Sequence, residues 1–348
     1  VTKVLSLLVQ HGADESILYE THPHIGTDKL PSVIENIRNA ILKSGGEVHF
    51  NTKVVSLIKK DENVIGVKCG NGEEYLGPVI LATGHSAKDV YRFLSISSVP
   101  LEAKDTAVGV RLEHPQSLID QIQYHNPKGR GDYLPPATYS FVTQVNGRGV
   151  YSFCMCPGGS IVPTATEYGY LSVNGMSSSS RSGSKANSAM VVQIRREDVP
   201  DKGIFSVLDW VEELERNSFR DKFMAPAQRM ADFVSNRLSS SLPGTTYAPG
   251  LVSSDLYGVL PPIVSSSLKE GFMAFNAMTR GKFLTNEAVM IASETRTSSP
   301  IRIIREDFKA VPGLYPAGEG SGYAGGIVSA AIDGTEVAKA VAERYSLK

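Results

Sequence analysis

A glycine-rich stretch near the carboxyl end constrains the fold of this chain most. Residues 313–334 read GLYPAGEGSGYAGGIVSAAIDG, a pattern that predicts a strand, a glycine-rich turn and a helix. Such a turn is typical of a cradle for phosphate or a ring system, because glycine lets the backbone approach a ligand and a helix start offers free N–H groups. A packed glycine turn without a ligand is the alternative, and the spacing alone leaves both open.

Composition excludes several classes of function. The chain has 348 residues and a formal net charge of −1, which argues against a nucleic-acid or anionic-membrane partner. No apolar run reaches the roughly 18 residues of a membrane span. Three cysteines are too few for a disulfide framework and favour an intracellular, reducing compartment. The histidines show no spacing typical of a metal site, so we expect no bound metal.

The order of patterns predicts an α/β fold with two domains. Two amphipathic helices are followed by short strands with turns between them, and the run PVILATG at 78–84 is apolar enough to be a strand covered on both faces. Strands and amphipathic helices then form a different, α+β region, in which the serine-rich segment 177–188 is expected to be a mobile loop. We expect one domain at 1–104 and 283–348, and an inserted substrate or cap domain at 105–282.

The helix that closes the chain is expected to pack on a sheet through one face. Small and apolar residues recur on that face at helical spacing: Ile327, Ala331, Gly334, Ala338, Val341 and Tyr345.

Seven motifs together resemble a known family. In chain order they are THPHIGTDKL, ILATGHSAKDVYRFL, VGVRLEHPQSLID, GVYSFCMCPGG, VNGMS, ETRTSSP and GLYPAGEGSGYAGGI. They resemble the uncharacterised FAD-dependent dehydrogenases and oxidoreductases, which have the glutathione-reductase-type FAD fold. The plant plastid members look most similar, which implies a plastid (chloroplast) location. The resemblance covers almost the whole chain and implies FAD as cofactor and a reaction class, but no substrate.

The resemblance also implies which residues contact FAD. Val54 would lie at the adenine side, the ATG strand end along the dinucleotide, the GEG turn at the ribityl and pyrophosphate part, and the start of the last helix at the flavin pyrimidine edge. The residues are Val54, Ala82, Thr83, Gly84, Gly318, Glu319, Gly320, Gly325, Gly326 and Ile327.

One departure from the family is important. Its members begin with a strand, a G-x-G-x-x-G turn and a helix, and no such motif occurs in this chain. We therefore expect an incomplete Rossmann-like FAD-binding layer with a β-hairpin or meander, in an N-terminally truncated chain that lacks its targeting segment. A missing central strand and helix would leave an open sheet face.

Four residues are candidates for catalysis. Cys154 and Cys156 form a C-x-C on an expected strand, where both would point to one side, about 6.6 Å apart, at the upper limit for a disulfide. Two free thiols are therefore expected, either near flavin or substrate or as small buried apolar groups. His85 follows the ATG strand. Arg296 could hold a carboxylate or the flavin oxygens, or pair with Glu294 or Glu306.

Three functions are compatible with the sequence. The first is an FAD-dependent oxidoreductase that transfers hydride between a small-molecule substrate and flavin. The second is a truncated, non-catalytic remnant that cannot hold FAD alone. The third is a flavin-dependent isoprenoid-chain reductase, which would need a long apolar tunnel. No second G-x-G-x-x-G suggests a nicotinamide site, so the electron donor or acceptor is not identified.

Overall fold

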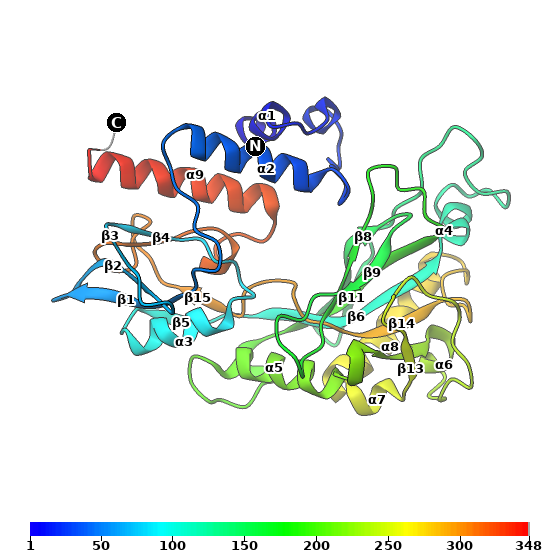
Figure 1. Cartoon of the computed structure of the whole chain (residues 1–348). Helices are drawn as coiled ribbons and strands as arrows, with labels where there is room; N and C mark the ends of the chain where they lie inside the picture. Colours follow the sequence, from blue (N-terminus) through cyan, green and yellow to red (C-terminus); the bar gives the residue numbers. More distant parts are fainter. Residues whose placement is uncertain (347–348) are drawn as a thin grey trace.

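The computed structural model describes residues 1–346 and has two parts that lie side by side (Figure 1). The smaller part contains both ends of the chain and three small sheets. The larger part is built on one extended sheet. Within residues 1–346, no helix combines the length and apolarity needed to cross a membrane.

The smaller part combines an antiparallel meander with two two-stranded sheets. The meander has the order β1-β2-β3, β4 pairs with β16, and β5 pairs with β15. Its helices surround these sheets, with α3 at the side that faces the larger part (Figure 1). The elements are α1 (Thr2–Gln10), η1 (Glu15–Leu18), α2 (Leu30–Lys43), β1 (Val54–Lys60), β2 (Asn63–Cys69), β3 (Glu74–Leu76), β4 (Val79–Leu81), α3 (Lys88–Ile96), β5 (Leu101–Ala103), β15 (Ile301–Ile303), β16 (Leu314–Pro316), η4 (Glu319–Ser321) and α9 (Ile327–Arg344).

The parallel pair β4–β16 brings the two glycine-containing turns together. Leu81 lies opposite Pro316, and the N–H of Ala317 donates to the carbonyl of Leu81 at 2.8 Å. Because both strands run in the same direction, the turns that follow them leave the sheet at the same edge, where ligands bind in open α/β sheets. The ATG end at 82–84 and the GEG turn at 318–320 are therefore neighbours.

One side of this layer is open, contrary to two sequence predictions. The run PVILATG is not covered on both faces, because Ile80 is 42% exposed. The predicted packing face of the last helix was only partly right: Val341 is buried, together with Val337, against Tyr315, whereas Ile327 is 73% exposed. On this face α9 covers Tyr315 of β16, while Ile80, which lies opposite Tyr315 on β4, stays exposed.

The larger part is built on a seven-stranded sheet in the order β13-β12-β14-β6-β11-β8-β7. β14 pairs with β6 and β12, so this sheet continues past the predicted boundary at 282. The elements are β6 (Thr106–Pro115), α4 (Gln116–Gln123), β7 (Val142–Val145), β8 (Arg148–Cys156), β9 (Ser160–Pro163), β10 (Val173–Met176), β11 (Lys185–Ile194), η2 (Arg196–Asp198), α5 (Ser206–Ser218), η3 (Asp221–Phe223), β12 (Ala225–Arg229), α6 (Met230–Val234), β13 (Leu251–Ser253), α7 (Leu256–Val259), α8 (Pro262–Met278) and β14 (Val289–Glu294).

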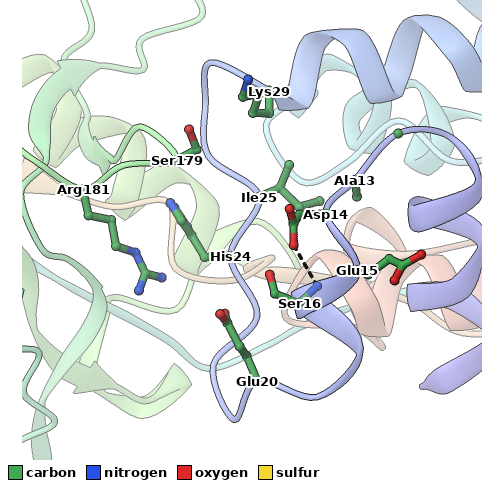
Figure 2. Close-up of a pocket in the computed structure, with 11 residues that line it drawn as sticks. Ala13, Asp14, Glu15, Ser16, Glu20, His24, Ile25, Lys29, Ser179 and Arg181 are labelled. Atoms are coloured by element: carbon green, nitrogen blue, oxygen red, sulfur yellow. Dashed lines mark hydrogen bonds between the residues drawn. The ribbon is translucent and has the colours of Figure 1, made fainter. Parts of the chain in front are cut away.

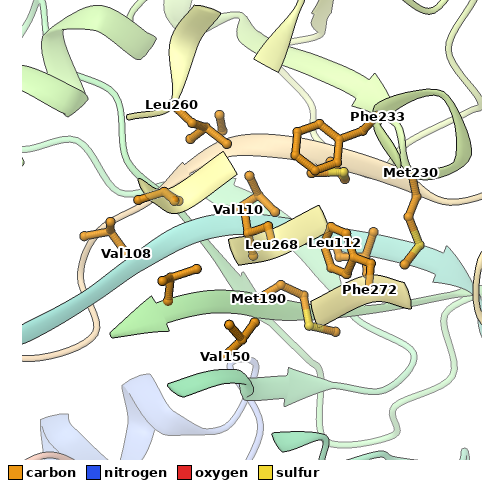
Figure 3. Packing of buried hydrophobic residues seen from close by; sticks show 14 of the residues in the cluster. Val108, Val110, Leu112, Val150, Met190, Met230, Phe233, Leu260, Leu268 and Phe272 are labelled. Atoms are coloured by element: carbon orange, nitrogen blue, oxygen red, sulfur yellow. The ribbon is translucent and has the colours of Figure 1, made fainter. Parts of the chain in front are cut away.

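The main core lies between this sheet and α8. Side chains alternate along β6, so Val108, Val110 and Leu112 enter the core while Arg111 and Glu113 face the other side. Met190 of β11 and aromatic side chains of α8 fill the space above them (Figure 3). The amphipathic helices predicted in this region are present as α5 and α8, whereas the third, α6, is only five residues long.

The opposite sheet face is covered by the β9–β10 hairpin. Ile161 and Val173 of this hairpin pack against Ala227 and Ile291 of the sheet. The fit is close: a Cβ on Gly175 would lie 2.1 Å from Nη2 of Arg111. Arg111 is thus enclosed between the hairpin and the sheet.

The serine-rich segment is tied to the N-terminal region and is not a free loop. Asp28 accepts hydrogen bonds from the N–H and the hydroxyl of Ser179, at 2.6 and 2.7 Å. The N–H of Thr27 donates to the carbonyl of Ser177 at 3.0 Å. The expectation of a mobile loop at 177–188 missed these contacts, because their partners lie about 150 residues earlier.

We predict that Phe272→Ala lowers the free energy of unfolding of the larger part by about 3–5 kcal/mol, since it leaves a cavity in the main core. Phe272 has no exposed surface, whereas its neighbour Met273 is 54% exposed. The matched control Met273→Ala should change stability by less than about 0.5 kcal/mol. Urea unfolding followed by the fluorescence of Trp210, which packs against this core, measures both. Equal effects of the two variants would contradict the assignment of the core.

Candidate functional site

The candidate site begins at the paired turns after β4 and β16. A Cβ on Gly320 would lie 2.6 Å from the carbonyl oxygen of Gly84, so only glycine allows this approach. Gly318 has φ 71° and ψ −154°, a conformation that other residues rarely adopt. Its N–H donates to Asp333 of α9 at 2.7 Å, and Asp333 is also paired with Arg305. The turn therefore has a defined shape.

The start of α9 is free to receive a ligand. Gly326 is its N-cap, no side chain caps the helix, and the position of a Cβ on Gly325 has no atom within 4 Å. The unpaired N–H groups of the first turn favour negative charge. Gly325 and Ile327 are exposed, as are Ala82 and Thr83 at the end of β4. These four predicted contacts are thus accessible at one end of the layer, whereas Gly318 and Gly320 are buried.

His85 and Glu319 connect the two turns. Nδ1 of His85 lies 3.3 Å from Oε1 of Glu319, while Nε2 of His85 is buried without a hydrogen-bond partner in the described part of the chain. The carboxylate holds the imidazole from one side and leaves the other nitrogen available. The structure therefore places a predicted catalytic candidate, His85, in contact with a predicted cofactor contact, Glu319.

Arg296 belongs to a buried ion cluster at the junction of the two parts. Its Nε donates to Oε1 of Glu215 on α5 at 2.8 Å, and Nζ of Lys88 on α3 donates to Oε2 of Glu215 at 2.5 Å. Glu215 is completely buried and also accepts a hydrogen bond from the hydroxyl of Thr295 at 2.7 Å. The partner of Arg296 is thus neither Glu294 nor Glu306 but a residue that the sequence analysis did not consider.

A small cavity separates this cluster from His85. Its volume is about 10 Å³, and its lining includes His85, Lys88, Thr106 and Arg296. Nη1 of Arg296, like Nε2 of His85, is buried without a partner. This volume is about that of one water molecule, which could hydrogen-bond to both atoms.

A much larger groove lies between the N-terminal region and the serine-rich segment (Figure 2). It has a volume of about 730 Å³, within the range of small-molecule sites. Nε2 of His24 lies 2.9 Å from the carbonyl oxygen of Ser178 and joins the two walls. Lys29 contributes positive charge from the N-terminal wall and Arg181 from the opposite wall, and three carboxylates, Asp14, Glu15 and Glu20, also line the groove (Figure 2).

The C-x-C contacts a buried arginine of the larger sheet through the carbonyl of Cys154 and the thiol of Cys156. Nη2 of Arg111 donates to the carbonyl of Cys154 at 2.6 Å and contacts Sγ of Cys156 at 3.2 Å, and Nη1 lies 3.5 Å from Oε2 of Glu294. Burial raises the pKa of Glu294 to about 7, and the Arg111 charge offsets only part of this effect. Sequence reasoning missed Arg111, because an arginine in a strand pattern looks like a surface residue.

The remaining candidates lie elsewhere. Val54 begins β1, outside the paired turns, and its neighbour Lys53 forms an ion pair with Asp89 of α3 at 2.7 Å. His114 is buried, its Nε2–H donates to the carbonyl oxygen of Phe283 at 3.0 Å, and burial lowers its pKa to about 4. No group of three or more possible metal ligands gathers within residues 1–346.

We predict that Glu215→Gln destabilises the protein by about 3–5 kcal/mol, because it removes the counter-charge of the buried Arg296 and leaves Lys88 only the more distant Glu212, at 3.8 Å. Glu213→Gln, on the exposed side of the same helix, is the matched control and should have an effect below about 0.5 kcal/mol. Thermal unfolding by circular dichroism compares them. If Glu215→Gln were as stable as the control, the cluster would not hold the junction.

The raised pKa of Glu294 predicts a pH dependence of stability. Between the ordinary carboxyl pKa of 4.5 and the folded value of about 7, the unfolded chain loses this proton while the folded protein keeps it. Stability contributed by this group therefore falls as pH rises through this window, and the loss is complete above it. Glu294→Gln should remove the decline, so its advantage over the wild type should grow from pH 4 to pH 8 by roughly 3 kcal/mol.

Urea unfolding at a series of pH values tests this, with Glu306→Gln, an exposed site, as control. A constant difference between Glu294→Gln and the wild type across the window would show that the carboxyl titrates normally.

Several known proteins are similar to this chain. An uncharacterized protein from Clostridium beijerinckii is 39% identical over 354 residues, which cover 99% of this chain and 66% of that protein. The chain thus spans just under two thirds of the length of this relative. Among solved structures, an oxidoreductase from Methanosarcina mazei matches with a TM-score of 0.35 and 13% identity, over 90% of this chain and 54% of that one. A salicylate hydroxylase substrate complex matches with a TM-score of 0.36 and 10% identity, over 90% and 55%.

The model of one protein family matches residues 105–297, which is more than half of the chain. This range contains the whole seven-stranded sheet, together with Glu215 and Arg296 of the ion cluster, whereas Lys88 lies outside it. The chain therefore belongs to the family described as FAD-dependent protein, C-terminal domain-like, an FAD-dependent oxidoreductase-like family whose cofactor is FAD.

Proposed function

We propose that this protein is an FAD-dependent oxidoreductase that transfers hydride between a small-molecule substrate and the flavin. The observation that carries the proposal is the uncapped start of α9 beside two glycine turns, in a chain of an FAD-dependent family. FAD supplies the redox chemistry when it is bound, and the protein supplies position and charge.

The residues at the paired turns fit a dinucleotide. Gly320 lets the turn after β16 approach Gly84, and the exposed Ala82 and Thr83 at the end of β4 would provide a wall for a ribityl or pyrophosphate group. The unpaired N–H groups of the first turn of α9 would stabilise negative charge at the pyrimidine edge of a flavin. Ala82, Thr83 and Gly84 fall on the same edge. A contact of Val54 with the adenine stays a prediction, because Val54 lies outside this edge.

We propose that the groove between the two parts receives the substrate. The groove is lined by charged side chains of both signs, among them Lys29, Arg181 and Glu20, which suit a polar molecule better than an isoprenoid chain, so no observation favours the isoprenoid reductase. His85, held by Glu319, would exchange a proton at Nε2. Arg296 is engaged by Glu215 and would act as a positioning residue.

The organisation of the parent protein follows from the same proposal. A partial FAD-binding domain at 1–104 and 283–348 would hold the cofactor, and an inserted α+β domain, predicted at 105–282 and extended through β14, would cover the substrate. The electron donor or acceptor is not identified by any site described. A plastid location has no support in the bacterial relative and stays a prediction from the resemblance.

We predict that FAD binds to the 348-residue chain and that Gly325→Asp weakens binding about tenfold or more, because a carboxylate then occupies the place of the anionic ligand. Gly334→Asp is the matched control: it adds the same charge to the same helix, at a position also free of neighbours. Quenching of flavin fluorescence on titration measures both, and circular dichroism checks folding.

A chain that binds no FAD at millimolar concentration would favour the non-catalytic alternative. Equal affinities of Gly325→Asp and Gly334→Asp would show that FAD does not lie at the start of α9.

A further inference from the structure

The two cysteines of the C-x-C lie on an irregular part of β8, unlike the regular strand that the sequence predicted. Phe153 pairs with Ala189 and Cys156 pairs with Asn187, so Cys154 and Met155 share a single opposing residue. This β-bulge places Cys154 at φ 47°, in the left-handed region. Met155 consequently packs toward the main core, while Cys156 reaches Arg111 on the other face.

The bulge brings Cys156 back toward Cys154, so that Sγ of Cys156 donates to the carbonyl oxygen of Cys154 at 3.7 Å. The hydrogen bond from Cys156, together with the Arg111 guanidinium, lowers the pKa of Cys154 to about 5, although burial acts in the opposite direction. The same interaction raises the pKa of Cys156. The pair therefore loses its first proton easily and its second with difficulty.

Arg111 is fixed in a geometry that favours a thiolate. It has no exposed surface, its Nε donates to the side chain of Asn187 at 2.8 Å, and its Nη2 contacts Cys156. Within residues 1–346, the carboxylate that pairs with it is Glu294, at 3.5 Å, whose burial favours the neutral acid. The positive charge is thus incompletely balanced by this carboxylate, and the dithiol is the remaining group beside it that can become an anion.

The two cysteines also differ in access. Cys154 is exposed and Cys156 is buried, and neither forms a disulfide. The neighbouring Phe153 lines a groove of about 450 Å³, together with Tyr151, Thr297 and Ser298. An exposed, acidic thiol beside a buried, weakly acidic one is the arrangement that dithiol exchange requires.

We propose that Cys154 and Cys156 form a redox-active dithiol that reduces low-molecular-weight disulfides, with Cys154 as the attacking thiolate and Cys156 as the resolving thiol. The Cys154 thiolate attacks one sulfur of the substrate disulfide, the S–S bond of the substrate breaks, and one substrate thiolate leaves. Cys156 then loses its proton to this leaving thiolate or to solvent and attacks Sγ of Cys154. The second substrate thiolate leaves, so that one disulfide becomes two thiols and the dithiol becomes a disulfide.

This activity needs no flavin, so its test is independent of the function proposed above. The 348-residue chain, reduced and freed of reductant, is mixed with bis(2-hydroxyethyl) disulfide and examined by intact-mass and peptide mass spectrometry. The wild type should lose two hydrogens between Cys154 and Cys156 and release two equivalents of the substrate thiol. Cys156→Ala should instead accumulate a mixed disulfide at Cys154, and Cys154→Ala should not react. Cys69, which is buried in the smaller part, is the internal control and should stay reduced.

A second readout separates a reactive thiol from a merely structural one. The rate of Cys154 alkylation by iodoacetamide, followed by peptide mapping across pH, should show a midpoint near pH 5 in the wild type. Cys156→Ala should move this midpoint upward by at least one pH unit, because the hydrogen bond to the thiolate is lost. An ordinary thiol midpoint in the wild type, a mixed disulfide equally frequent at Cys69, or disulfide formation in Cys154→Ala would each overturn the proposal.

Discussion

The arrangement of this molecule depends on one buried carboxylate. Glu215 lies at the junction of the two parts. Its carboxylate accepts hydrogen bonds from Lys88 of α3, in the smaller part, and from Arg296, in the segment that follows β14. Burying these charges costs free energy that only close mutual contacts offset, so the junction is stable in one geometry only. Lys88 follows His85 by three residues, and the geometry at Glu215 therefore also determines where the imidazole lies relative to the larger sheet.

Local patterns predicted the parts of the site that are made by neighbouring residues. The strand, turn and helix at 313–334 are present as β16, η4 and α9, and the end of β4 lies beside them because parallel strands end at one edge. The amphipathic helices α5 and α8 were also found at their predicted places. In each case, the spacing of apolar residues and the position of glycines determine the local structure over a few neighbouring residues. Such short-range patterns can be read directly from a sequence.

The features that the sequence did not reveal depend on distant partners. Arg296 and Glu215 are 81 residues apart, and Arg111 and Asn187 are 76 apart, so no spacing rule connects them. The C-x-C was interpreted by the alternation of a regular strand, and one extra residue in β8 changed which face each side chain reaches. The predicted face of α9 was only partly right, since Val341 packs on the sheet but Ile327 does not, and the pattern of small residues does not say how much of a helix has a layer to pack against.

The open side of the β4–β16 layer has a calorimetric consequence. Ile80 and Ile327 hold apolar surface in contact with water, and water next to apolar groups has a high heat capacity. Whatever comes to cover this face, whether another stretch of polypeptide or a ring system, would release that water into bulk. The heat capacity of the complex would therefore be lower than the sum of its parts, and the enthalpy of association would become more favourable with each degree of warming.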